Sequence, residues 1–163
     1  MRRMHAELYR EGHVVTQLAL AEYRATLEAE SGVDGLRKML FGMGSLSLGE
    51  LAGERMKVSL EANSPEDEQD CFSDNTHNSH FYDAKGIRNV YLGEYTRTDG
   101  TKMTGPSLSS LVVVVDPAAD ATLKSDLADT EAKIQVMVDR AAKGENKPTA
   151  VISSCAPLLA TKR

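Results

Sequence analysis

Apolar residues recur along most of the chain at three- and four-residue spacing, the pattern of helices that bury one face. Residues 4–30 consist largely of good helix formers and predict a first helix that ends at Gly32. Asp34 is placed to cap a second helix, whose apolar positions extend over residues 36–58. The first third of the chain is therefore expected to be helical.

The middle of the chain predicts a third helix with a strong start. Ser64-Pro65-Glu66-Asp67 combines a capping serine, a proline at the first helical position and an acid three residues after the cap. This helix is expected to run to Lys85 and to stop at Gly86, and residues 87–95 should form a further short helix. Residues 96–106, rich in Thr, Gly and Lys, predict a loop.

Two more helices are expected in the last third of the chain. The run Val112–Val115 favours a strand by propensity, but its helical neighbours favour a short helix over residues 107–115. Asp116-Pro117 supplies a cap and a first position for a long helix that ends at Gly144. The tail from Glu145 has two prolines and no periodicity, so we expect it to be loosely ordered. The sequence thus predicts an all-α helical bundle.

Composition supports one helical domain and excludes several classes of function. The 163 residues are 41% hydrophobic but only 5% aromatic, with no Trp, so the core must be aliphatic and methionine-rich. A formal net charge of −5 disfavours nucleic-acid binding, which needs an excess of Lys and Arg. No apolar run approaches the roughly 20 residues of a transmembrane segment. The sequence has neither a glycine-rich phosphate loop nor a G-x-S-x-G elbow, so we expect no bound nucleotide and no serine hydrolysis.

The start of the chain and its cysteines give little information on compartment. Polar residues such as His5 and Glu7 occupy the place of an apolar signal core, so we expect no signal peptide in this chain. Cys71 and Cys155 are too few for a disulfide framework and form no C-x-x-C pair. Their redox state is left open.

A dense polar segment, residues 66–80, carries the candidate chemistry. If it is helical, Asp70, Asp74 and His77 share one face, because each residue turns the helix by about 100°. Carboxylates and imidazoles at this spacing can hold a metal ion in a helical bundle. They equally suit a buried hydrogen-bond network or a solvated polar face, and the segment lacks the H-E-x-x-H motif of zinc peptidases. The residues alone leave both interpretations open.

A glycine-rich stretch, residues 42–55, precedes that segment. A glycine inside a helix costs about 1 kcal/mol relative to Ala, so these glycines suit a close helix crossing or a break near a site. Glu50 and Arg55 lie five residues apart, which is not ideal for a pair on an α-helix. We expect them to be surface charges unless the glycines bring another helix close. Cys71 follows several acids, which disfavour a reactive thiolate, and is expected to be a small buried residue.

Several stretches of the chain resemble the imelysin family. They are residues 42–56 (GMGSLSLGELAGERM), 66–77 (EDEQDCFSDNTH), 86–93 (GIRNVYLG), 105–108 (GPSL) and 116–118 (DPA). The resemblance covers roughly residues 22–144. It implies a protein of the periplasm or cell envelope that is linked to iron uptake and classed as a metal-dependent peptidase, with two helical bundles and a site between them.

Departures from the family pattern shape what we expect of this chain. Residues 22–144 should correspond to part of the C-terminal half of the family fold, with residues 1–21 an atypical N-terminal helix and residues 145–163 a poorly ordered tail. The family motif G-x-H-x-x-E does not occur, and Gln69 stands where the family usually has His. We therefore expect a fragment or a frame-altered product that lacks the N-terminal bundle. Independent peptidase activity is not expected, and a non-catalytic helical remnant is a further alternative.

The resemblance also suggests the wall of a site. The expected metal ligands are Asp70, Asp74 and His77, and the expected further wall residues are Glu50, Arg55 and Ser73. Iron or zinc would bind only weakly, because too few ligands converge. Apolar residues that a missing bundle would cover should promote self-association. These residues are Met39, Met43, Leu46 and Leu48.

Overall fold

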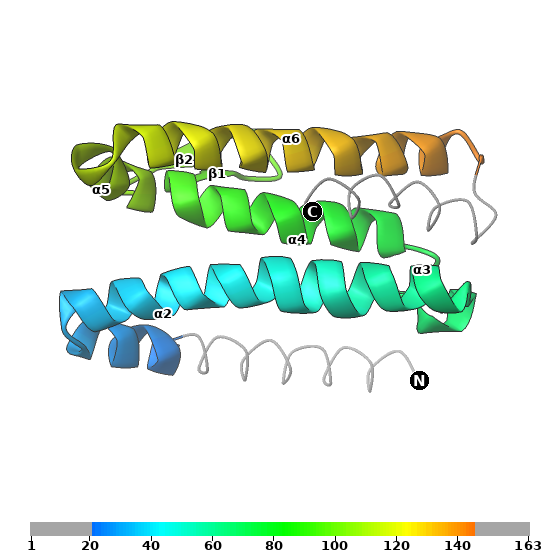
Figure 1. The fold of residues 1–163 in the computed structure, drawn as a ribbon, viewed down its shortest axis with the longest axis horizontal. Coiled ribbons are helices and arrows are strands. Elements are labelled where there is room, and N and C mark those ends of the chain that lie inside the picture. The colour runs from blue at the N-terminus through cyan, green and yellow to red at the C-terminus, as the bar shows by residue number, and fades with distance from the viewer. Residues whose placement is uncertain (1–20, 146–163) are drawn as a thin grey trace. The chain divides into compact units, whose positions relative to one another are not determined.

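A computed structural model describes residues 21–145, which are helical apart from one β-hairpin and the connecting turns (Figure 1). The predicted all-α fold is confirmed. The chain divides into two compact units after Phe41. Most of the expected atypical N-terminal helix, nearly all of the expected tail, and Cys155 lie outside the described residues. Within residues 21–145, no helix has the length and apolar character needed to cross a membrane.

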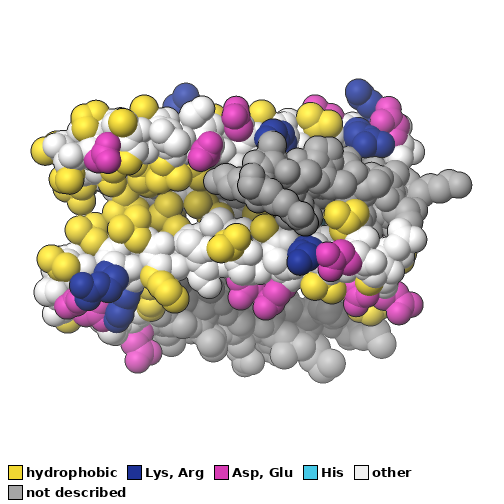
Figure 2. All heavy atoms as spheres, in the orientation of Figure 1, with side chains coloured by type: hydrophobic (Ala, Val, Ile, Leu, Met, Phe, Trp, Pro, Cys, Tyr) yellow, Lys and Arg dark blue, Asp and Glu magenta, His cyan; other side chains and the backbone are white. Residues whose placement is uncertain are grey.

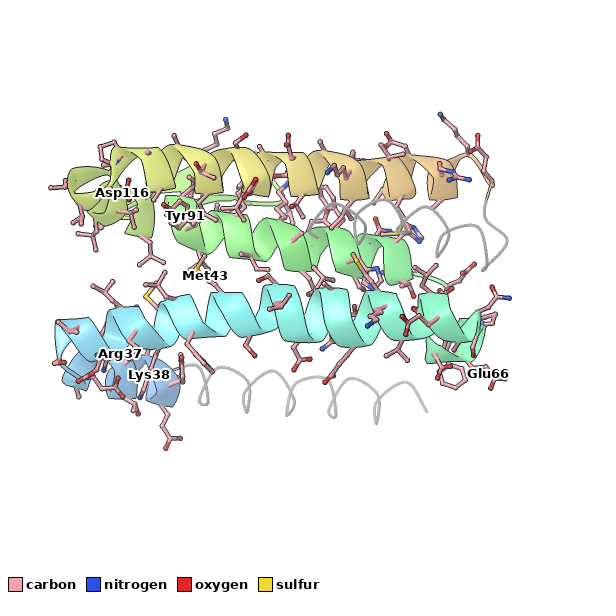
Figure 3. All side chains as sticks on the ribbon, in the orientation of Figure 1. Arg37, Lys38, Met43, Glu66, Tyr91 and Asp116 are labelled. Carbon is pink, nitrogen blue, oxygen red and sulfur yellow. The ribbon has the colours of Figure 1, made fainter. Side chains whose placement is uncertain are left out.

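The first unit contains a helical segment, residues 21–29, and the start of α2 (Gly32–Gly44). Gly32 opens α2 instead of ending the first helix. The prediction that Asp34 caps α2 is wrong, because Ser31 has that role: its hydroxyl accepts the Asp34 N–H at 3.2 Å and donates to the Asp34 carboxylate at 2.7 Å. Asp34 lies in the first turn, where a carboxylate is favoured by the helix dipole, and pairs with Arg37 at 2.9 Å (Figure 3).

The predicted second helix continues from α2 into η1 (Ser45–Lys57) and α3 (Val58–Ala62). The η1 segment is a π-helix, in which each N–H bonds to the carbonyl five residues earlier. Residues five apart then lie on the same side of the helix. Leu51 and Met56 accordingly both reach the core, with 4% and 5% of their surface exposed. The glycine-rich stretch is therefore a helix with wide turns.

The third helix begins later than predicted. Ser64 makes no side-chain capping hydrogen bond, and Pro65–Asp67 forms only one 3₁₀ turn, η2. Residues 68–75 form turns, and the helix itself, α4, spans Thr76–Leu92. The S-x-x-D pattern thus marks a single helical turn and not the start of a long helix.

Short polar side chains explain the delayed start of α4. The Ser73 hydroxyl donates to the Asp70 carbonyl at 3.3 Å, and Asp74 adopts a left-handed conformation with φ of 53°. Ser, Asp and Asn compete with helical hydrogen bonding in this way. A regular helix becomes possible only after Asn75.

The prediction that Gly86 stops this helix is also wrong. A Cβ at Gly86 would have no atom within 4 Å, and α4 continues to Gly93, where φ is 63°. A Cβ at Gly93 would lie 2.7 Å from the Pro106 carbonyl oxygen, so close packing requires glycine there. The expected loop that follows contains an antiparallel hairpin, β1 (Glu94–Thr96) with β2 (Lys102–Thr104).

The helical prediction for the valine run is confirmed by α5 (Leu108–Val115). Ser107 caps this helix, and its hydroxyl accepts a backbone N–H at 3.0 Å. The last helix, α6 (Pro117–Ala142), begins as predicted: the Asp116 carboxylate accepts the Ala119 N–H at 2.9 Å (Figure 3).

The core of the second unit surrounds α4, which packs against both η1 and α6 (Figure 1). The buried cluster consists of Leu51, Met56, Ala84, Ile134 and Met137, with Phe81 against it. Aliphatic and methionine side chains therefore fill the core, as the composition indicated.

A polar junction joins α4, α5 and α6. Tyr91 is fully buried, and its hydroxyl donates to Asp120 Oδ1 at 2.8 Å (Figure 3). The Ser109 hydroxyl donates to the same oxygen at 2.7 Å, and Lys124 Nζ lies 2.7 Å from Oδ2. The Lys124 ammonium and the two hydroxyls lower the pKa of Asp120 below its ordinary value. Every contact of this buried carboxylate is thus with a donor.

The residues expected at an exposed apolar face differ in their surroundings. Leu48 is 78% exposed, whereas Met39, Met43 and Leu46 are half-buried. The last valines of α5 are exposed too, and Figure 2 shows hydrophobic side chains gathered over that helix. Self-association of the chain stays a prediction.

Candidate functional site

Glu50 and Arg55 form an ion pair on η1. The wide helical turns bring these residues, five apart, onto one face, and Arg55 Nη2 donates to Glu50 Oε2 at 3.1 Å. Both side chains remain partly exposed, as expected of surface charges, but α-helical spacing did not anticipate their pairing. The Nε of Arg55 is buried and has no hydrogen-bond partner among the described residues.

The turn before α4 brings two carboxylates to the buried start of that helix. The Asp70 N–H donates to Thr76 Oγ1 at 3.1 Å, and Thr76 is buried. Glu68 is 8% exposed, and burial raises the pKa of its carboxyl although a hydrogen bond with Thr76 opposes this effect. Glu68 Oε1 and Asp70 Oδ2 are buried without hydrogen-bond partners in the described part of the chain.

His80, on the second turn of α4, is 3% exposed. Burial lowers the pKa of His80 to about 4, and the positive charge of Arg55 acts in the same direction. The carboxylates of Asp83 and Asp70 act in the opposite direction. Neither ring nitrogen has a hydrogen-bond partner within residues 21–145. The imidazole is therefore neutral at pH 7, and one of its nitrogens has a lone pair available.

These side chains form what we call the polar cluster, whose members each have a buried polar atom without a partner among the described residues. The members are Arg55, Glu68, Gln69, Asp70 and His80. His80 interacts electrostatically with Asp70 and Arg55, and Thr76 links Glu68 to Asp70. A buried polar group without a partner costs about 1–3 kcal/mol, and native proteins contain few of them. Several such atoms in one place make the polar cluster the candidate site within residues 21–145.

The cluster includes some of the predicted site residues and not others. Asp70, Asp74 and His77 do not share a helix face, because only His77 lies on α4. Asp70 belongs to the polar cluster, whereas Ser73 and Asp74 are exposed in the preceding turn. His77 is half-buried, and its Nε2 lies 3.1 Å from the Asn78 side-chain nitrogen.

His80 lies in the polar segment that the sequence singled out, but it is not among the predicted metal ligands. Five residues are buried along α4 at spacings of four and three: Thr76, His80, Ala84, Ile87 and Tyr91. This helical stripe is visible in the sequence, and it would have placed His80 on the buried face of a helix starting at Thr76. Because the helix was predicted to start at Ser64, the predicted ligands were instead those on the helix face of Asp70 and His77.

Gln69 connects the polar cluster to an open pocket. Its amide nitrogen lies 3.4 Å from Asp83 Oδ2, whereas its amide oxygen is buried without a partner among the described residues. The pocket has a volume of about 450 Å³. It is lined by Gln69, Asn75, Asn78, Ser79, Tyr82 and Asp83. A small polar ligand can therefore reach one edge of the cluster from solvent.

Whether these residues suit a metal ion depends on donor chemistry and on convergence. Carboxylate oxygens and a neutral imidazole nitrogen are ligands for zinc and iron. Among residues 21–145, however, no three His, Cys, Asp or Glu side chains converge closely enough to hold a metal ion. The charge of Arg55 also disfavours a cation beside it. The donors therefore fit, but the arrangement provides only part of a coordination sphere.

The fold and the polar cluster together describe an all-α protein. Near the start of its helix α4 lie buried polar groups without hydrogen-bond partners among the described residues. The sequence profile of the imelysin family, peptidase family M75, matches residues 6–154, and this chain belongs to that family. The match extends past residues 22–144 at both ends. No curated protein matches the chain.

Proposed function

We propose that this chain is a metal-binding imelysin-family protein of the cell envelope that serves iron uptake, and that the polar cluster forms one face of its metal site. Family membership supports the cellular role. The observation that supports metal binding is that a buried, neutral His80 lies within electrostatic reach of Asp70, and that both have polar atoms without partners among the described residues. A bound cation would satisfy those atoms.

The proposed ligands fall into a buried pair and an exposed pair. Asp70 and His80 are the buried donors, and Asp74 and His77 lie nearer to solvent. Arg55 would stay paired with Glu50. Binding by these donors should be weak, because a closed site needs four or more converging ligands.

A metal-dependent peptidase is the second candidate function, because the matching family is named as a peptidase family. That activity needs a metal with an open position and a general base. The G-x-H-x-x-E motif does not occur in the sequence, and the cluster supplies few converging ligands. We therefore infer metal binding without independent cleavage. Peptide hydrolysis that a chelator abolishes would instead support the peptidase.

Calorimetric titration with Zn²⁺, and with Fe²⁺ under anaerobic conditions, tests the proposal. Asp70→Asn combined with His80→Gln removes the buried pair, and Asp74→Ala combined with His77→Ala removes the exposed pair. Asp129→Asn, an exposed change on α6, is the matched control for a lost negative charge. Circular dichroism first verifies that each variant folds.

Saturable binding in the parent that weakens in the buried-pair variant but not in Asp129→Asn is the expected result. Weakening in the exposed-pair variant would extend the ligand set to the turn. Heat changes that never saturate, or affinities equal to the parent in both double variants, would reject metal binding at the cluster. Thermal unfolding that is unchanged by excess metal would then favour a non-catalytic helical remnant.

A further inference from the structure

A separate pocket lies between α4, the β-hairpin and α6, with a volume of about 290 Å³. Side chains alternate between the faces of a strand, so Glu94 and Thr96 share one face of β1. The hairpin register places Thr104 opposite Glu94 and Lys102 opposite Thr96. All four residues line the pocket. One face of the hairpin thus contributes four polar residues to the pocket, Tyr95 and Met103 also line it, and α4 and α6 supply the other walls.

Arg88 of α4 occupies a central position in this pocket. Its Nη1 lies 3.4 Å from Glu94 Oε1 on β1 and 3.3 Å from Glu131 Oε2 on α6. Both contacts are ion pairs through the same nitrogen, and Arg88 donates no hydrogen bond within residues 21–145. The guanidinium is therefore oriented on one side, while Nε and Nη2 remain available as a pair of donors. Such a pre-oriented fork matches two oxygens of a carboxylate or phosphate group.

Two lysines flank the guanidinium. Lys85 comes from the preceding turn of α4, with its Nζ 5.3 Å from the centre of the Phe81 ring. Lys102 is exposed on β2 and has no ion pair in the described part of the chain. With Arg88, these lysines give the pocket lining three positive charges. Glu94 and Glu131 contribute two negative charges. The pocket is thus locally cationic in a chain of net charge −5.

We propose that this pocket binds a small anion that carries a carboxylate or phosphate group. Arg88 is the central contact, and Lys85 and Lys102 neutralise the remaining charge. The volume is near the lower end of the roughly 300–1,000 Å³ of ligand pockets, so the anion is a small molecule. The residues are different from those of the polar cluster, and the site does not depend on metal binding.

The test is a titration of isotope-labelled protein followed by amide NMR shifts. Inorganic phosphate and succinate are added in separate arms at constant ionic strength, with chloride as the reference anion. Arg88→Lys keeps the charge but removes the fork, and Lys102→Met removes one charge from the exposed hairpin. Arg140→Lys, on α6 and paired with Glu145 at 3.5 Å, is the matched control.

We expect saturable shifts at the hairpin and α4, with phosphate or succinate binding at least tenfold more weakly in Arg88→Lys and several-fold more weakly in Lys102→Met. Arg140→Lys should bind like the parent. The arm that saturates at lower concentration identifies the anion class. If Arg88→Lys does not fold, the affinity of Lys102→Met for the anion, compared with that of the parent, decides whether the proposal holds. Shifts that fail to saturate in both arms, or equal affinity in the parent and in the pocket variants, would overturn the proposal.

Discussion

The buried junction of Tyr91, Ser109 and Asp120 gives a quantitative prediction for Tyr91→Phe. This change removes one hydroxyl, which donates to Asp120 at 2.8 Å, and leaves the ring in place. A hydrogen bond to a charged group contributes about 1.5–3 kcal/mol to stability. Asp120 keeps the Ser109 and Lys124 donors, so we expect a loss of about 2 kcal/mol. At roughly 2–4 °C per kcal/mol, the melting temperature should fall by about 4–8 °C.

Urea unfolding followed by far-ultraviolet circular dichroism measures this loss. Tyr82→Phe is the matched control, because Tyr82 lies on the same helix and is 64% exposed. It should change stability by less than about 0.5 kcal/mol. Combining Tyr91→Phe with Ser109→Ala should give a coupling energy of about 0.5–3 kcal/mol, since both hydroxyls share Asp120 Oδ1. Equal losses for Tyr91→Phe and Tyr82→Phe would refute the reasoning.

Three further predictions concern the same unit. Burial and the bond to Asp120 raise the pKa of Tyr91 to about 12, so its stabilisation is complete below pH 10 and is lost between pH 10 and 12. Absorbance titration should show one tyrosine ionising last. Burial lowers the pKa of His80 from 6.5 to about 4, so stability should fall by about 3 kcal/mol as the pH drops through that range, and the ring resonances should titrate near pH 4. Chemical unfolding should show Gly86→Ala to be stabilising by up to about 1 kcal/mol, because its Cβ meets open space on a helix, and Gly93→Ala to be strongly destabilising. The reverse order for the two alanine variants would contradict the account of how α4 ends.

Local capping signals predicted the C-terminal half of the fold well. Asp116-Pro117 starts α6 because its cap depends only on neighbouring residues. Ser64 has an equally good helix-capping pattern, yet the helical turn ends at Asp67. The Ser-Asp-Asn run that follows forms hydrogen bonds to the local backbone, which compete with helix formation. A cap thus predicts where a helix can start but not how far it extends.

The candidate site was harder to predict because it depends on tertiary packing. The pairing of Glu50 with Arg55 requires the wide turns of η1, which α-helical spacing rules do not anticipate. Five-residue spacing of Leu46, Leu51 and Met56 was the available sequence signal. The burial of His80 follows from the packing of α4 between η1 and α6, and its sequence signal, the buried stripe of α4, depends on knowing that the helix starts at Thr76.

Metal binding at the polar cluster is tested most directly at the histidine rings themselves. A long-range proton–nitrogen NMR spectrum reports each imidazole nitrogen during titration with Zn²⁺, because a coordinated nitrogen shifts strongly. The account predicts that a ring nitrogen of His80 shifts saturably, and that Asp70→Asn weakens the response. Ring nitrogens of His80 and His77 that both stay unchanged in excess Zn²⁺ would contradict it.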